Sequence, residues 1–135
     1  MKLHIKKNGS ISDIQKEFNT GFPYLKIEFF WHSHANRELS PKNDKIDPLT
    51  SVAKLVKWDR DKVIKVNEQM KTIEFETMWE KKYGLFVQVF RKSGRVWLET
   101  SHTDDWSLER QNEEGKMMSS IHNVNPEEEN AWDEY

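Results

Sequence analysis

The chain contains no cysteine. Disulfide bonds and thiolate metal sites are therefore excluded. It also lacks the run of about 18 consecutive apolar residues that a membrane-spanning helix needs. The first ten residues, MKLHIKKNGS, have no apolar segment of the kind that a secretory signal carries. These absences predict a cytoplasmic protein with no membrane partner.

Aliphatic side chains are also scarce. Hydrophobic residues make up 36% of the chain and charged residues 33%, and the mean hydropathy is −0.91. Aromatic residues compensate, because they reach 12% and include six tryptophans and seven phenylalanines. Each of them can remove roughly 150–250 Å² from water when it is buried. A chain of 135 residues can therefore form one domain, or two very small modules that share a core.

Charge is distributed unevenly along the chain. Residues 1–70 carry a net charge of +4 and residues 71–135 a net charge of −6. Much of the negative excess lies at the C-terminal end, where five acids and no lysine or arginine follow Ser119. We expect a disordered acidic tail over residues 119–135, because that segment has no apolar periodicity.

The first half of the chain predicts a strand, a helix and a second strand. Alternation over residues 2–6 predicts the first strand. The spacing of Ser12 and Gln15 is that of a capping box, and the helix that it would open has apolar residues on one face as far as Phe22. Residues 24–31 predict a second strand whose polar face holds Lys26 and Glu28. A polar loop over 32–47 and a helix beginning at Asp47-Pro48, with Leu49 facing inward, follow.

The second half predicts a similar order of elements. A short strand over residues 63–66 precedes a helix from Thr72 to Tyr83, with Gly84 as its C-cap. Two apolar runs, 87–90 and 96–98, flank a loop containing Gly94 and predict a β-hairpin. Asp104-Asp105 would then cap a short helix that ends at Gly115.

The two halves also share an apolar pattern. Ile14, Phe18 and Phe22 correspond to Phe75, Trp79 and Tyr83 at a constant offset, and the second half needs one extra residue before its strand. We therefore expect an α+β fold of two tandem modules: β-α-β-α over residues 1–58 and β-α-β-β-α over residues 61–118. A duplication would explain the pattern, and each half is too small to form a core alone.

Several stretches resemble an uncharacterised family of small soluble bacterial proteins. The features that carry the resemblance are Tyr83-Gly84, the hairpin from Val87 to Thr100, and Thr103 to Asn112 with Gly115. Residues 11–18 and 23–30 of the first half are also similar. The resemblance covers about residues 1–118 and implies a stable α+β module, but no activity or site.

Three histidines are candidate metal ligands. His32 and His34 are two residues apart, so in an extended segment both imidazoles would point the same way. His102, with Asp104 or Asp105, could complete a site that suits Zn²⁺ or a similar ion. Loop histidines in solvent are the competing interpretation. The paired acids could also serve general acid–base catalysis, but two adjacent acids that open a helix are more often a cap.

Basic and aromatic residues could form a face for single-stranded nucleic acid. The candidates for this face are Lys6, Lys7, Lys16, Tyr24, Lys26, Phe30, Arg91, Lys92, Arg95 and Trp97. Acidic residues interrupt the pattern and the isoelectric point is about 6.2, so nucleic acid is not the expected partner.

By elimination, the sequence favours a non-catalytic interaction module without a cofactor. An exposed strand edge or an aromatic patch would contact a protein partner, with Trp97 and Trp106 as anchors, because tryptophan is enriched at binding hot spots. The alternatives are a hydrolase-like enzyme that uses a metal at His32, His34 and His102, and a weak binder of single-stranded nucleic acid. The acidic segment after residue 119, which contains Trp132 and Tyr135, has the composition of short binding tails as well as of solubilising ones.

Overall fold

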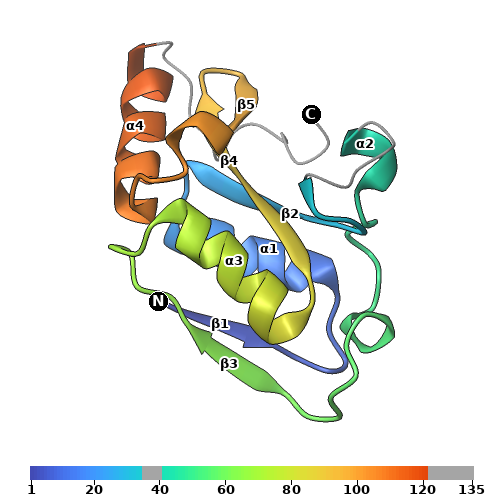
Figure 1. Ribbon diagram of the computed structural model, residues 1–135. Coiled ribbons are helices and arrows are strands. Elements are labelled where there is room, and N and C mark those ends of the chain that lie inside the picture. The colour runs from blue at the N-terminus through green and yellow to red at the C-terminus, as the bar shows by residue number, and fades with distance from the viewer. Residues whose placement is uncertain (35–40, 122–135) are drawn as a thin grey trace.

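The computed structural model describes residues 1–34 and 41–121, and its fold is α+β (Figure 1). Its strands are β1 (Lys2–Ile5), β2 (Leu25–Phe30), β3 (Lys62–Lys65), β4 (Phe86–Ser93) and β5 (Val96–Glu99). Its helices are α1 (Ile11–Gly21), the single turn α2 (Pro41–Asp44), α3 (Thr72–Tyr83) and α4 (Leu108–Ile121). Across the described ranges, no helix has the length and apolar content that crossing a membrane requires.

The strands form two small antiparallel sheets. β1 pairs with β3, and the second sheet has the order β2-β4-β5. Within these sheets Leu3 lies opposite Ile64 and Ile27 lies opposite Val89. Helices α1 and α3 lie between the two sheets (Figure 1). Each half of the chain therefore supplies one strand to the β1–β3 pair and one to the β2–β4 pair.

One hydrophobic core draws side chains from both halves. It includes Leu3 and Ile5 of β1, Phe18 of α1, and Phe75 and Trp79 of α3. The rings of Phe18 and Phe75 are 5.2 Å apart, and the edge of Trp79 packs on Phe29 at 5.3 Å. The large aromatic side chains thus supply the burial that the low aliphatic content does not.

The predicted hairpin and the predicted α3 are confirmed. β4 and β5 pair antiparallel, with Arg91 opposite Leu98. Helix α3 ends at Gly84, which has a φ of 66° and donates its N–H to Glu80 O. A residue with a Cβ is strained in this left-handed conformation, which explains glycine at that position.

The predicted helix at Asp47-Pro48 is wrong. Asp47 instead forms a turn in which its Oδ1 accepts the Leu49 N–H at 2.8 Å, and Leu49 is 82% exposed. The carbonyl groups of Pro48 and Thr50 accept the N–H groups of Ser12 and Ile11. They therefore complete the start of α1, which removes them from any helix of their own. Only the turn Val52–Lys54 is helical here, as a 3₁₀ helix.

Two predicted helix boundaries also change. Helix α1 begins after Ser10, whose N–H donates to Asp13 at 3.0 Å, so Ser12 is not its cap. Helix α4 begins at Leu108 and continues through Gly115 to Ile121. Asp104 lies outside α4, and its carbonyl accepts the Ile73 N–H at 2.8 Å.

The predicted loop and tail are each described only in part. Helix α2 lies inside the stretch predicted as a loop over residues 32–47. Residues 119–121, placed in the acidic tail, belong to α4. The rest of the predicted tail, from 122 onward, lies outside the described residues.

Candidate functional site

The sheet β2-β4-β5 has two buried faces of different chemistry. Leu25, Ile27, Phe29, Val87 and Val89 pack against the helices in the main core. Because side chains alternate along a strand, their neighbours point to the opposite side. We call that side the outer face and define it by Lys26, Glu28, Phe30, Gln88, Phe90, Lys92, Trp97 and Glu99.

Lys26 and Glu28 contradict the prediction of a solvated strand face. They are 0% and 1% exposed, and Lys26 Nζ lies 3.4 Å from Glu28 Oε1. Gln15 Nε2 donates to Glu28 Oε2 at 3.1 Å, and Lys45 Nζ is 4.0 Å from the same oxygen. The alternation of side chains was predicted correctly. The error was the assumption that the polar side of the strand faces water.

Burial dominates the electrostatics of Glu28. Loss of solvent raises the pKa of this carboxyl above its ordinary value, and the charges of Lys26 and Lys45 counteract the rise only in part. Desolvation of a buried ion pair commonly costs as much as the attraction returns. The pair is therefore a poor source of stability.

Trp97 lies on the outer face close to two lysines. The ammonium groups of Lys26 and Lys92 are 5.2 and 5.1 Å from its ring centre, and Lys26 is also 5.4 Å from the Phe90 ring. A cation over an aromatic face at these distances is attracted by the ring quadrupole. Trp97 is half-buried, and its Nε1 is a buried donor with no acceptor among the described residues.

Trp106 lies elsewhere and is held tightly. The guanidinium carbons of Arg91 and Arg110 lie 5.3 and 3.9 Å from the centre of its ring. Its carbonyl accepts both the N–H and the hydroxyl of Thr72, at 2.8 and 2.9 Å. Since Arg91 and Lys92 are neighbours on β4, their side chains leave the sheet on opposite sides. The two predicted anchors therefore do not form one aromatic patch.

Strand β5 supplies the exposed apolar groups of the hairpin. It is the last strand of its sheet, and Val96 and Leu98 are 53% and 41% exposed. In the part of the chain that the structure describes, β5 pairs with β4 alone. Its second edge presents backbone donors and acceptors beside exposed apolar side chains, which is the composition of an edge that can accept another strand.

The three candidate histidines occupy different settings. His32 Nδ1 lies 2.6 Å from Asp44 Oδ1, and the His32 N–H donates to the same carboxylate. His34 lines a pocket, and His102 is an exposed residue of the 3₁₀ turn Ser101–Thr103. Over residues 1–34 and 41–121, no group of three or more His, Asp or Glu side chains is placed to hold a metal ion. Zinc binding stays a prediction, which calorimetry of the wild-type chain and of His34→Ala would check.

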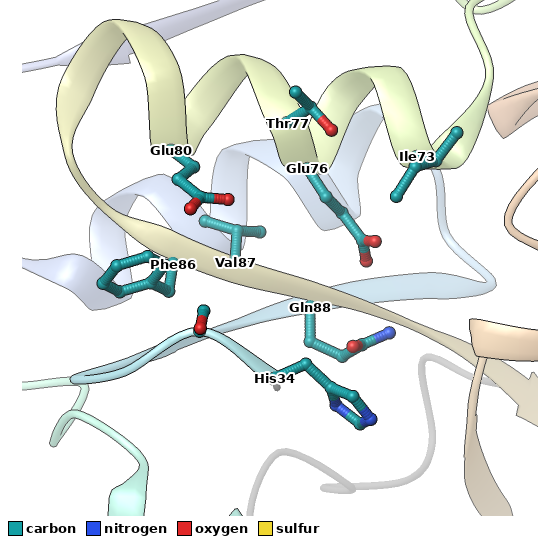
Figure 2. Close-up of a pocket in the computed structure, with 9 residues that line it drawn as sticks. His34, Ile73, Glu76, Thr77, Glu80, Phe86, Val87 and Gln88 are labelled. Atoms are coloured by element: carbon teal, nitrogen blue, oxygen red, sulfur yellow. The ribbon is translucent and has the colours of Figure 1, made fainter. Parts of the chain in front are cut away.

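The pocket beside His34 has a volume of about 130 Å³ and lies between α3 and β4 (Figure 2). Glu76 and Glu80 of α3 and Gln88 of β4 line it. Glu76 Oε2 accepts the Val89 N–H at 2.8 Å, and Gln88 Nε2 donates to Val89 O at 3.1 Å. Side chains thus form the hydrogen bonds of the Val89 N–H and carbonyl groups, at a position of β4 that lies beyond its pairing with β5. The sequence carried no signal for this role of Glu76.

The predicted nucleic-acid face is buried in part. Lys26, Lys92 and Phe30 are all buried, although the prediction placed them on one solvated face. Arg91 is partly buried and bonds Gln111 Oε1 at 2.6 Å. Its burial lowers the pKa of its guanidinium, and nearby Glu114 opposes the shift. Lys26, Lys92 and Arg91 of the expected basic surface therefore contact other parts of the protein.

Comparison with known protein families, with curated proteins and with solved structures finds no match to this chain. No family is identified, so the resemblance to small bacterial proteins stays a prediction.

Proposed function

We propose that the chain is a non-catalytic interaction module that binds a protein partner by strand addition at β5. The observation that carries the proposal is the position of β5 at the end of its sheet, with Val96 and Leu98 exposed. An added strand gains affinity from backbone hydrogen bonds and specificity from alternate side chains. Trp97 stiffens the strand from the other side, because its ring packs against Lys26 and Lys92.

The test uses a charge on the edge that the partner would cover. Lysine on an edge strand opposes the addition of another strand. The immobilised wild-type chain is used to capture a protein from a lysate. We expect the immobilised Leu98→Lys variant to capture at least about tenfold less of that protein. Val63→Lys is the matched control, because Val63 is also 53% exposed on a strand, in the other sheet. A captured protein that Leu98→Lys retains in full would refute binding at β5.

We further propose that the modules 1–58 and 61–118 arose by duplication. The strand register supports this proposal. Leu3 pairs with Ile64, which is its counterpart at the offset that relates the two helices. Ile27 pairs with Val89, its counterpart once the extra residue of the second half is counted. Equivalent residues that pair with each other are expected where two copies meet about a twofold axis.

A further inference from the structure

The side chains of β5 are arranged symmetrically about the centre of the strand. Trp97 has an exposed apolar residue on each side, Val96 at 53% and Leu98 at 41% exposed. The next residues outward carry opposite charges, because Arg95 lies in the turn before the strand and Glu99 is its last residue. Reversing the direction of such a strand leaves its apolar positions apolar and exchanges a positive charge with a negative one. The strand is therefore complementary to a copy of itself that runs in the opposite direction.

The position of β5 in the fold suits such a copy. β5 is the last strand of the sheet β2-β4-β5, and within residues 1–34 and 41–121 it pairs with β4 alone. It lies at the opposite end of the molecule from β1 and β3 (Figure 1). A second chain that pairs with β5 through its own β5 would continue the sheet from one molecule into the other.

Two-fold symmetry limits the registers in which two β5 strands can pair. In a two-fold contact, a residue that faces a given residue of the partner is itself faced in the same way from the other chain. Residues directly opposite each other point to the same side of a sheet, whereas successive residues of one strand point to opposite sides. One residue of β5 must therefore face its own copy.

The register in which Trp97 faces its own copy is the one that pairs opposite charges. It places Arg95 opposite Glu99 and Val96 opposite Leu98, and the symmetry repeats both pairs. A register centred on Val96 would put Arg95 opposite Trp97, and a register centred on Leu98 would put Glu99 opposite Trp97. Opposite charges at directly opposed positions stabilise a strand pair, so charge complementarity selects the register centred on Trp97.

We propose that β5 binds a second copy of this chain, in an antiparallel pair with Trp97 at the two-fold axis. The Val96 and Leu98 side chains of both copies form an apolar cluster on one side of the joined sheet. The two Trp97 rings meet on the outer face. This inference rests on the strand addition proposed above and names its partner. Because the contact is one short strand from each chain, the dimer is in equilibrium with the monomer.

Single cysteines can report the register, because the natural chain has none. Full chains carrying Val96→Cys or Leu98→Cys are oxidised in air, alone and as an equimolar mixture, and the disulfide dimers are identified by mass. We expect the mixed dimer to form at least about tenfold faster than the dimer of either variant alone, because directly opposite residues have the Cβ separation that a disulfide needs. Val63→Cys, exposed on β3, gives the rate of random collision.

Charge reversals test the same register without a covalent bond. Arg95→Glu and Glu99→Arg each place like charges opposite each other in a pair of identical chains. We expect each variant alone to dimerise at least about tenfold more weakly than the wild type, and an equimolar mixture of the two to dimerise again. Sedimentation velocity over a range of concentrations measures the dimer. Lys65→Glu, exposed on β3, is the matched control and should dimerise like the wild type.

Three results would overturn the proposal. They are a wild-type chain that stays monomeric at about 1 mM, a mixture of the charge variants that dimerises no better than either alone, and a cysteine variant that couples to itself faster than in the mixture. The Leu98→Lys experiment then decides the fate of strand addition itself. A protein captured by the wild type and lost by Leu98→Lys would leave strand addition at β5 intact with a different partner, and one that this variant retains in full would refute both.

Discussion

Trp79 shows how much of the core rests on single aromatic side chains. It is fully buried, and it contacts the rings of Phe29, Phe75 and Tyr83. Its Nε1 is buried without an acceptor among the described residues. The ring therefore stabilises the fold, while its N–H group costs free energy.

We expect Trp79→Ala to lower the free energy of unfolding by about 3–5 kcal/mol, because it leaves a large cavity. Trp79→Phe should cost much less, since it keeps an aromatic ring and removes the unsatisfied donor. Urea unfolding measures both, with Trp31→Ala as the control at a 52% exposed position. Equal losses for Phe and Ala at position 79 would contradict the role assigned to the N–H.

Glu28 makes a prediction about pH. Its pKa is raised in the folded state by burial, so the folded protein binds this proton more readily than the unfolded chain. The contribution of Glu28 to stability is then greatest below the unfolded pKa of about 4.3, and it falls as the pH rises through the folded pKa.

The measurement is the difference in unfolding free energy between the wild-type chain and Glu28→Gln from pH 4 to pH 7. The other carboxyl groups cancel in this difference. We expect the advantage of the wild type to decrease as the pH rises. An increase would mean that Lys26 and Lys45 outweigh desolvation and lower the pKa of Glu28.

At the scale of elements, the packing of α4 depends on one glycine. A Cβ on Gly115 would lie 2.8 Å from Tyr24 Cβ, 3.1 Å from Tyr24 O and 3.2 Å from Arg91 Cγ. Helix α4 therefore approaches the sheet more closely than it could if position 115 carried a residue with a side chain.

Gly115→Ala should destabilise the protein, although alanine improves an isolated helix by about 1 kcal/mol. Thermal unfolding checks this expectation, with exposed Ser120→Ala in the same helix as the control. A rise in Tm for Gly115→Ala would show that α4 can move away from Tyr24 at little cost.

The same glycine shows where prediction from the sequence succeeds and fails. The turn at Gly94, the apolar faces of α1 and α3 and the end at Gly84 follow from local chemistry, and all were predicted. Gly115 was predicted to end a helix, because its close contact with Tyr24 is not a local property. The burial of Lys26, the turn at Asp47 and the separation of Trp97 from Trp106 likewise depend on which elements meet in space.

At the scale of the whole molecule, neither half can complete a sheet alone. In the described residues, the strands of the first half pair with strands of the second half: β1 pairs with β3, and β2 pairs with β4. We expect fragments 1–60 and 61–135 each to lack sheet signals in circular dichroism, and an equimolar mixture to regain them. A fragment that folds independently would contradict the shared core.

The interleaving of the two halves also has a consequence in time. The Met1 nitrogen donates to Val66 O, 65 residues further along the chain. Leu25 of β2 likewise pairs with Arg91 of β4, in the second half of the chain. On a ribosome the first half emerges with both of its strands unpaired, because β1 pairs with β3 and β2 pairs with β4, and β2 stays unpaired until β4 has been synthesised. Long loops must close before these contacts form, so folding should be slow for a chain of this length. The nascent chain thus passes through a period in which β1 and β2 are open to other chains, and chaperones would act on it then.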